Sequence, residues 1–155
     1  MTNNPEIKHS SIKNVDFGKN VKLVEPVNLY GCSLGDEVFI GPFTEIQSNV
    51  IIGNRTKIQS HSFICELVKI GHDCIISHGV MFINDLFKNG NPAFGNKKLW
   101  KSTLIENNVL IGTNSTILPV SICSNVVIGA GSLVSKSINK SGIYCGNPAK
   151  FIRKI

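Results

Sequence analysis

The chain has 155 residues, a formal net charge of +6 and 42% hydrophobic residues, which suits a single domain with a continuous core. No apolar run approaches the ~20 residues of a transmembrane helix, and the first residues do not resemble a signal peptide. No run of lysine or arginine exceeds two residues, which argues against a nucleic-acid groove. We expect a cytoplasmic protein, with no membrane insertion and no nucleic acid as partner, whose excess positive charge serves small anionic ligands.

The first 14 residues form a polar, irregular lead, and a six-residue repeat then governs residues 15–83. Between residues 34 and 82 a large apolar residue stands at every sixth position: Leu34, Ile40, Ile46, Ile52, Ile58, Ile64, Ile70, Ile76 and Phe82. Four positions after each of the first eight stands a small or β-branched residue: Val38, Thr44, Val50, Thr56, Ser62, Val68, Cys74 and Val80. Neither a helix nor a half-buried strand has this period. It is typical of a parallel β-helix of hexapeptide repeats.

In such a β-helix each hexapeptide forms one short strand, and three of them close a triangular coil of 18 residues. We predict that the large apolar residue points into the prism and that the small residue packs beside it. A glycine often follows the large residue, as at Gly35, Gly41, Gly53 and Gly71. We predict that these glycines take the corners, where a positive φ angle favours a residue without a Cβ.

The period fails over residues 84–103, which we interpret as a loop inserted at one corner. The next large apolar residue should stand at position 88, but it is Ile105. Long loops in compact domains are usually functional. This loop carries the only tryptophan, Trp100, together with Phe87 and Phe94, so we expect it to pack against a neighbouring subunit or to cover a ligand.

The repeats resume over residues 104–138, and residues 139–155 form a short C-terminal tail. An open β-helix end exposes unpaired backbone groups, so we expect the tail to cover it. The fold class is therefore all-β, with one domain over residues 1–155.

The five cysteines are odd in number and include no CxxC motif, which disfavours both a disulfide framework and a zinc site. Cys74 occupies a small inward position, so we predict a buried thiol that acts as a small apolar residue. Cys65 is predicted to lie at a corner.

Residues 18 apart are predicted to lie above one another on successive coils. Glu66 and Asn84 then share one column, and His78 has Ser60 beneath it, with His61 close by on the previous coil. The polar residues predicted to cluster where the loop leaves the coils are Gln59, His61, Glu66, His78, Asn84 and Asp85. This is more polar surface than subunit packing alone needs.

Two stretches resemble the left-handed β-helix acyltransferases of the hexapeptide-repeat superfamily. IGAGSLVSKSI and YCGNPAKFIR, within residues 128–153, are similar to the closing motif of members that use CoA. IQSHSFICELVKIGHDCIISHGVMFIND, residues 58–85, resembles the nucleotide-linked amino-sugar N-acetyltransferases, above all those that acetylate the 3-amino group of a dTDP- or UDP-hexose. The resemblance implies a left-handed coil, a homotrimer with active sites between subunits, acetyl-CoA as co-substrate without a metal, and a place in surface polysaccharide biosynthesis such as that of lipopolysaccharide.

The chemistry implied is attack of a neutral sugar amine on the acetyl thioester of acetyl-CoA. A histidine suits proton removal near neutral pH, so His78 and His61 are the candidates nearest the amine. In the relatives an asparagine at the position of Asn84 contacts the sugar, and the thiolate of CoA is the alternative proton acceptor to a histidine. Glu66, Gln59 and Asp85 are further candidates for substrate contacts.

The cofactor assignments follow from the same resemblance. Backbone groups around Thr113, Ala130 and Gly131 would pair with the pantetheine amides. The tail would receive the adenosine and the 3′-phosphate, with Lys136, Pro148, Lys150 and Arg153 as candidate contacts. For the nucleotide of the acceptor, Arg55 and the loop lysines are candidate phosphate ligands, and Trp100 or Phe87 is a candidate for stacking on the base.

Three alternatives remain open. A hexapeptide O-acetyltransferase would use a hydroxyl acceptor in place of the amine. A carbonic anhydrase of the same fold would need three histidines around zinc, but His61, His72 and His78 lack the H-x4-H spacing. A non-catalytic scaffold would not need the CoA-type tail.

Overall fold

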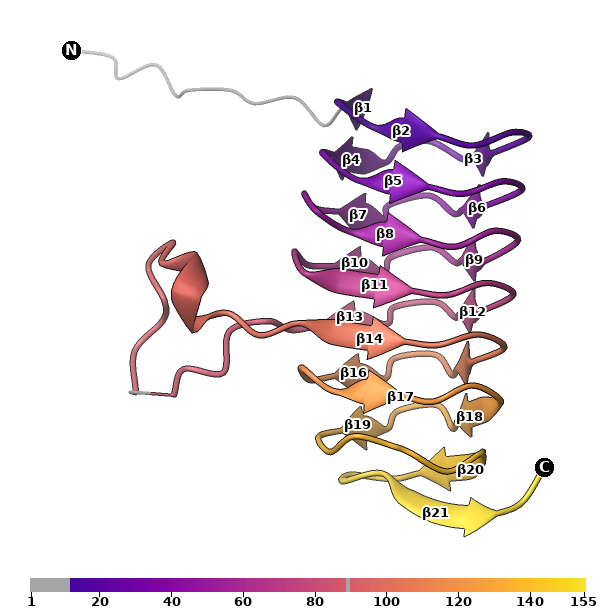
Figure 1. Ribbon diagram of the computed structural model, residues 1–155, viewed down its shortest axis with the longest axis vertical. Helices are drawn as coiled ribbons and strands as arrows, with labels where there is room; N and C mark the ends of the chain where they lie inside the picture. Colours follow the sequence, from indigo (N-terminus) through magenta and orange to yellow (C-terminus); the bar gives the residue numbers. More distant parts are fainter. Residues whose placement is uncertain (1–11, 89) are drawn as a thin grey trace.

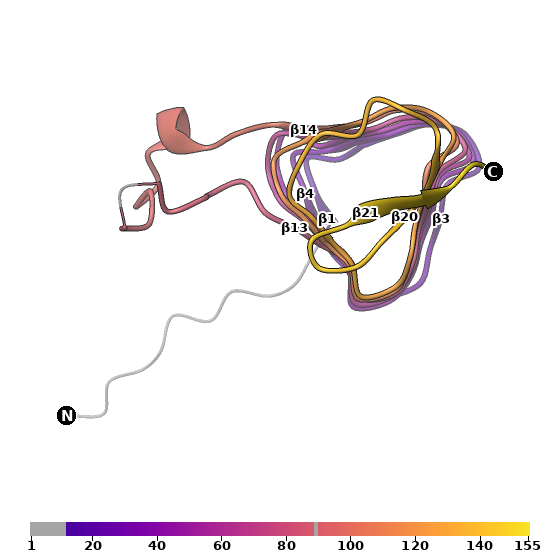
Figure 2. The same ribbon diagram turned by 90° about the horizontal axis from the view of Figure 1, so that it is seen from below.

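The structure is a computed structural model that describes residues 12–88 and 90–155. The chain winds into a left-handed, three-sided β-helix with a triangular cross-section, as predicted (Figure 1, Figure 2). Most of the predicted irregular lead, residues 1–11, lies outside the described residues. Ile12–Lys13, predicted to belong to that lead, form strand β1 and pair with β4, so the coils begin earlier than the repeat suggested.

Three parallel sheets form the sides of the prism. Sheet A contains β1 (Ile12–Lys13), β4 (Asn28–Tyr30), β7 (Glu45–Ile46), β10 (Phe63–Ile64), β13 (Met81–Phe82), β16 (Thr116–Ile117) and β19 (Leu133–Val134). Sheet B contains β2 (Asp16–Phe17), β5 (Ser33–Leu34), β8 (Ile51–Ile52), β11 (Val68–Ile70), β14 (Thr103–Ile105) and β17 (Ser121–Ile122). Sheet C contains β3 (Lys22–Leu23), β6 (Phe39–Ile40), β9 (Lys57–Ile58), β12 (Ile75–Ile76), β15 (Leu110–Ile111), β18 (Val126–Ile128), β20 (Gly142–Cys145) and β21 (Lys150–Arg153).

The core follows the predicted pattern. All nine large apolar residues from Leu34 to Phe82 are buried, as are all eight small residues that follow them. The hydroxyl groups among the small residues donate to backbone carbonyls of the next coil: Thr56 Oγ1 lies 2.8 Å from Gly71 O, and Ser62 Oγ lies 3.1 Å from Ser77 O. Since a buried hydroxyl is costly without a partner, these bonds explain why threonine and serine can alternate with valine inside the prism.

The role predicted for the glycines is wrong. The residue with positive φ is the third after most of the large apolar residues, and it is seldom glycine: Asn20, Glu37, Phe43, Asn49, Arg55, His61, Leu67, Asp73, Asn108, Asn114 and Asn125. The glycine directly after the large residue is needed for a different reason. A Cβ on Gly53 would lie 2.5 Å from the carbonyl carbon of Gly71, so the backbones of successive coils approach too closely there for any side chain.

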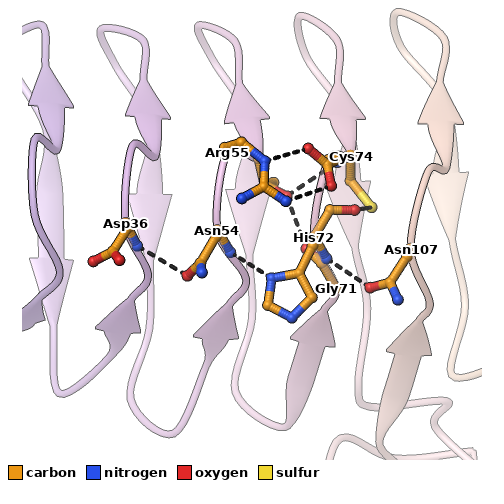
Figure 3. A network of polar contacts seen from close by, with 9 residues as sticks. Asp36, Asn54, Arg55, Gly71, His72, Cys74 and Asn107 are labelled. Carbon is orange, nitrogen blue, oxygen red and sulfur yellow. Dashed lines mark hydrogen bonds and ion pairs between the residues drawn. The ribbon is translucent and has the colours of Figure 1, made fainter.

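We name the corners by the sheets that they join, so that the chain passes through the AB, BC and CA corners in turn. Along the BC corner each turn donates a backbone N–H to a side chain of the next turn (Figure 3). Asp36 N donates to Asn54 Oδ1 (3.0 Å), Asn54 N to His72 Nδ1 (2.9 Å), and His72 N to Asn107 Oδ1 (2.8 Å). These bonds use N–H groups that the sheets leave unpaired, and they tie four coils together.

The inserted loop leaves the AB corner after β13 and returns at β14, standing away from the prism (Figure 1, Figure 2). Ile105 pairs with Ile70, so the prism continues as if the insertion were absent. The loop is closed at its base by a bond from Lys101 N to Asn84 O (3.0 Å), and it contains one short 3-10 helix, η1 (Lys97–Leu99). Phe87 and Phe94 are 58% and 86% exposed, so both rings are largely open to solvent.

The tail covers the C-terminal end of the prism, as expected (Figure 2). β20 continues sheet C in parallel with β18, and β21 then folds back antiparallel onto β20. Tyr144 and Phe151 pack edge to face with their ring centroids 5.4 Å apart.

We predict that Gly53→Ala destabilises the protein by about 2 kcal/mol or more, because the added Cβ must push apart two backbones. Gly131→Asn is the matched control. Gly131 has positive φ with open space around its Cβ position, and asparagine occupies that place in other coils. Thermal unfolding should show a large fall in Tm for the first variant and little change for the second; equal losses would contradict our account of the corners.

We also predict that His72→Ala lowers the free energy of unfolding by about 1 kcal/mol, because the N–H of Asn54 loses its acceptor. His72→Asn should restore most of this loss, since asparagine fills the same place at residues 54 and 107. Denaturant unfolding of the two variants measures the difference. If they were equally unstable, the bond between coils would contribute nothing.

Candidate active site

The predicted polar cluster is divided between two corners of the prism. Ser60, His61 and His78 lie at the CA corner, between sheets C and A. Glu66 and Asn84 lie at the AB corner, where the loop departs. One side of the prism, sheet A, separates the two groups, so a single chain does not bring all the predicted residues together.

At the CA corner the predicted stacking of His78 on Ser60 is confirmed. His78 Nδ1 and Ser60 Oγ lie 2.8 Å apart, in a hydrogen bond whose direction depends on the histidine tautomer. His61 has a left-handed backbone (φ 62°), and its ring stacks on Phe43 of the previous coil, with the centroids 4.9 Å apart. Gln59 is half-buried and precedes Ser60 on the same turn.

The predicted pantetheine contacts continue this corner directly below His78. Asn114 N donates to His78 O (2.9 Å), and Gly131 N donates to Thr113 O (2.8 Å). Ala130 and Gly131 are exposed, and no heavy atom lies within 4 Å of a Cβ built on Gly131. The corner thus exposes Ala130 and Gly131 two coils below the histidine.

At the AB corner the predicted stacking of Asn84 on Glu66 is also confirmed. Asn84 Nδ2 donates to Glu66 O over 3.2 Å. The Glu66 carboxylate, whose side chain is only 12% exposed, accepts two bonds from Lys97 Nζ of the loop at 2.9 and 2.7 Å. The same ammonium lies 5.6 Å from the ring centroid of Trp100. The loop is therefore held against the coil by a charged contact.

A polar network above Glu66 was missed by the sequence reasoning. Glu45 accepts hydrogen bonds from Asn28 Nδ2 (3.1 Å) and Tyr30 OH (3.3 Å), and Gln47 Nε2 lies 3.1 Å from the same carboxylate. Gln47 Oε1 in turn accepts the N–H of Glu66. Burial, followed by the charge of Glu45, raises the pKa of Tyr30. The sequence did contain a signal for this network. Asn28 and Glu45 both take the outward position of their strands, and they are paired on neighbouring strands.

Two residues predicted to contact the substrate, Asp85 and Arg55, have partners within the chain. The Asp85 carboxylate accepts backbone N–H groups of Phe87 (3.0 Å) and Ala93 (2.7 Å), so it organises the loop. Arg55 lies at the BC corner, away from the loop, and its guanidinium binds Asp73 through two bonds of 2.7 and 2.8 Å. This ion pair lowers the pKa of Asp73.

The four predicted contacts of the adenosine end of CoA are also dispersed. Lys136 follows β19 at the AB corner, on the other side of sheet A from Thr113, and so does not join that column. Pro148 and Lys150 lie where the tail turns back near the CA corner, since Lys150 pairs with Cys145. Arg153 lies at the other end of β21, opposite Ile143.

All five cysteines are free thiols. Cys74 is buried, as predicted, but Cys65 is also buried although it follows β10 at a corner. Burial raises the pKa of Cys65 to about 12 and that of Cys32 to about 11, so both stay protonated near neutral pH.

Two negative findings concern residues 12–88 and 90–155. Within these ranges no group of three His, Cys, Asp or Glu side chains is arranged to hold a metal ion. His72 lies at the BC corner, apart from His61 and His78. Nor does any helix in the same ranges have the length and hydrophobicity to cross a membrane.

Two family profiles match the repeats. Residues 31–66 match the profile described as bacterial transferase hexapeptide (six repeats), and residues 103–136 match that of the hexapeptide repeat of succinyl-transferase. A probable macrolide acetyltransferase of Lysinibacillus sphaericus is 36% identical over 112 residues, which is 59% of this chain and 62% of that protein. The chain thus spans less than two thirds of this curated relative.

Two solved structures are similar over most of their length. AntD, an N-acyltransferase from Bacillus cereus crystallised with dTDP and coenzyme A, superposes with a TM-score of 0.79 at 26% identity, covering 90% of this chain and 83% of AntD. The polySia-specific acetyltransferase NeuO is 30% identical with a TM-score of 0.54, covering 90% of this chain and 70% of NeuO. With the buried hexapeptide core, the left-handed coil and both profiles in agreement, the chain belongs to the hexapeptide-repeat acyltransferases.

Proposed function

We propose that the protein is an acetyl-CoA-dependent N-acetyltransferase of the cytoplasm. Its acceptor is the amino group at C3 of a dTDP- or UDP-linked amino sugar, which is a precursor of surface polysaccharide. The observation that carries the proposal is the CA corner, where His78, Thr113 and the exposed Ala130 and Gly131 lie in one column on successive coils. This order matches a thioester laid along the lower coils with its acetyl group beside the imidazole. The likeness to AntD, which was crystallised with both dTDP and coenzyme A, supports this pair of ligands.

The reaction needs one proton transfer and no redox step. The neutral amine attacks the thioester carbonyl carbon, the tetrahedral intermediate collapses with loss of the CoA thiolate, and the amine nitrogen gives up a proton. When Nδ1–H of His78 donates to Ser60 Oγ, Nε2 carries the lone pair and can accept that proton. The thiolate is the alternative final acceptor. Proximity of amine and thioester contributes the rest of the rate enhancement.

Glu66 and Asn84 take part if a second subunit supplies them. In a homotrimer the AB corner and loop of one subunit face the CA corner of the next, which assembles a site that a single chain leaves divided. Burial of the exposed Phe87 and Phe94 of the loop against the neighbouring subunit would stabilise such a contact. The Asn84 side-chain oxygen and the Glu66 carboxylate would then orient the amine and the sugar hydroxyls.

A hydroxyl acceptor is the second candidate, supported by the likeness to the probable macrolide acetyltransferase and to NeuO. Acetyl transfer from acetyl-CoA, followed as free thiol release, separates the two. We expect turnover with a dTDP-3-amino-3,6-dideoxyhexose and none with the matching 3-hydroxy sugar nucleotide. Turnover with the hydroxyl compound alone would favour the O-acetyltransferase.

We predict that His78→Ala lowers kcat by ~10²-fold or more, the usual contribution of a general base. Ser60→Ala should lower kcat less and shift its pH profile, because the serine only selects the tautomer of His78. His72→Asn, at the BC corner, is the control and should keep normal kinetics. A fall of only a few-fold in His78→Ala would leave positioning and the CoA thiolate as the mechanism.

Mixing two inactive variants tests the shared site. His78→Ala and Asn84→Ala chains, unfolded and refolded together in equal amounts, should regain about a quarter of wild-type activity, because a random mixture leaves that fraction of interfaces with both residues intact. Each variant refolded alone is the control. A mixture as inactive as its components would show that both residues act within one chain, and light scattering of the wild type should give a trimer.

A further inference from the structure

The outer face of sheet C carries a pocket that the assignments above leave unused. It has a volume of about 470 Å³ and is lined by Asn20, Lys22, Glu37, Val38, Phe39, Lys57 and Gln59. Phe39 is paired directly with Lys22 on one neighbouring strand and with Lys57 on the other, so the ring lies between two exposed lysine side chains. Its volume is in the range of sites for nucleotide-sized ligands.

The lining residues follow one another along the strands in a definite order. Asn20 and Glu37 stand at the BC corner, the Lys22, Phe39 and Lys57 row follows two positions later, and Gln59 stands two positions beyond Lys57. At ~3.3 Å per residue, each step of two positions covers about 6–7 Å. The pocket therefore runs across sheet C towards the CA corner and ends beside Ser60, the hydrogen-bond partner of His78.

We propose that this pocket binds the nucleoside diphosphate of the sugar nucleotide, an assignment that rests on the proposed function. The nucleoside faces Asn20 and Glu37, with its pyrimidine against the near edge of Phe39, and the diphosphate lies beyond it, between the ammonium groups of Lys22 and Lys57. The sugar then extends past Gln59, which delivers its amine to His78. CoA approaches the same histidine from the opposite side, along Thr113, Ala130 and Gly131.

The charges of the molecule favour this pocket over Lys97 and Arg55. Lys97 is already paired with the mostly buried Glu66 through two short bonds, so a phosphate would have to displace a carboxylate. Arg55 is likewise paired with Asp73. The Lys22 and Lys57 pair flanks an aromatic ring, the combination that a base joined to two phosphates requires. Glu37 is the one acid of the lining, and it lies at the nucleoside end.

Calorimetric titration of the whole protein with dTDP and, separately, with CoA tests the assignment. The double variant Lys22→Gln with Lys57→Gln should bind dTDP at least tenfold more weakly while its affinity for CoA is unchanged. Phe39→Leu should weaken dTDP binding as well. Lys69→Gln is the matched control, since Lys69 is also an exposed lysine on a strand but belongs to sheet B. Unchanged CoA binding by each variant shows that the coils are intact.

The outcomes separate this assignment from the proposed function. If wild-type protein binds dTDP and the double variant binds it equally well, the pocket is not the site, whereas the acceptor class stands. If Lys98→Gln alone removes binding, the loop holds the nucleotide and the pocket assignment is wrong. If wild type binds CoA but neither dTDP nor UDP, both the assignment and the nucleotide-linked acceptor fall. Should the double variant misfold, Lys57→Gln alone must weaken dTDP binding for the assignment to survive.

Discussion

The close approach of successive backbone turns at the corners is the constraint on which the rest of the structure depends. Each turn hydrogen-bonds to the next throughout the three sheets, so the turns cannot separate where the chain bends. A Cβ on Gly53 or Gly112 would lie 2.5 Å from backbone atoms of the following turn. At these two places only glycine avoids a clash with the next turn, whereas other bends begin with residues such as Gln47 and Gln59. The left-handed residue of the bend can be asparagine, histidine or arginine.

This freedom is what allows the corners to carry chemistry. His61, Arg55 and Asp73 all occupy left-handed corner positions that a glycine could equally fill. Side chains at a corner have as neighbours the residues one turn above and below, which explains why polar pairs such as Ser60 with His78 and Asn84 with Glu66 are 18 residues apart. A column of such residues makes an extended groove, and an extended ligand such as CoA or a sugar nucleotide suits a groove better than a closed cavity.

The predictions from the sequence were right for every feature that the six-residue period alone fixes. The inward residues, the insertion between Phe82 and Ile105, and the vertical pairs all follow from counting in steps of six and eighteen. The sequence reasoning was wrong in placing His78 beside Glu66, because residues 12 apart stand at different corners of an 18-residue turn. It did not foresee the partners of Asp85 and Arg55, because a repeat gives no information about whether a side chain will bind a loop backbone or an oppositely charged neighbour.

The sequence by itself determined the three-sided coil, because short strands that bury one large residue at every sixth position close a triangular turn of 18 residues. It also determined which residues share a column, since the turn length is fixed by the backbone hydrogen bonds. Only the tertiary structure decided the contacts that the period does not govern: the pairing of Glu66 with Lys97 from the inserted loop, the network around Glu45, and the pocket of Lys22, Phe39 and Lys57. These depend on side-chain reach and charge across strands and on the course of an aperiodic segment, and no repeat encodes either.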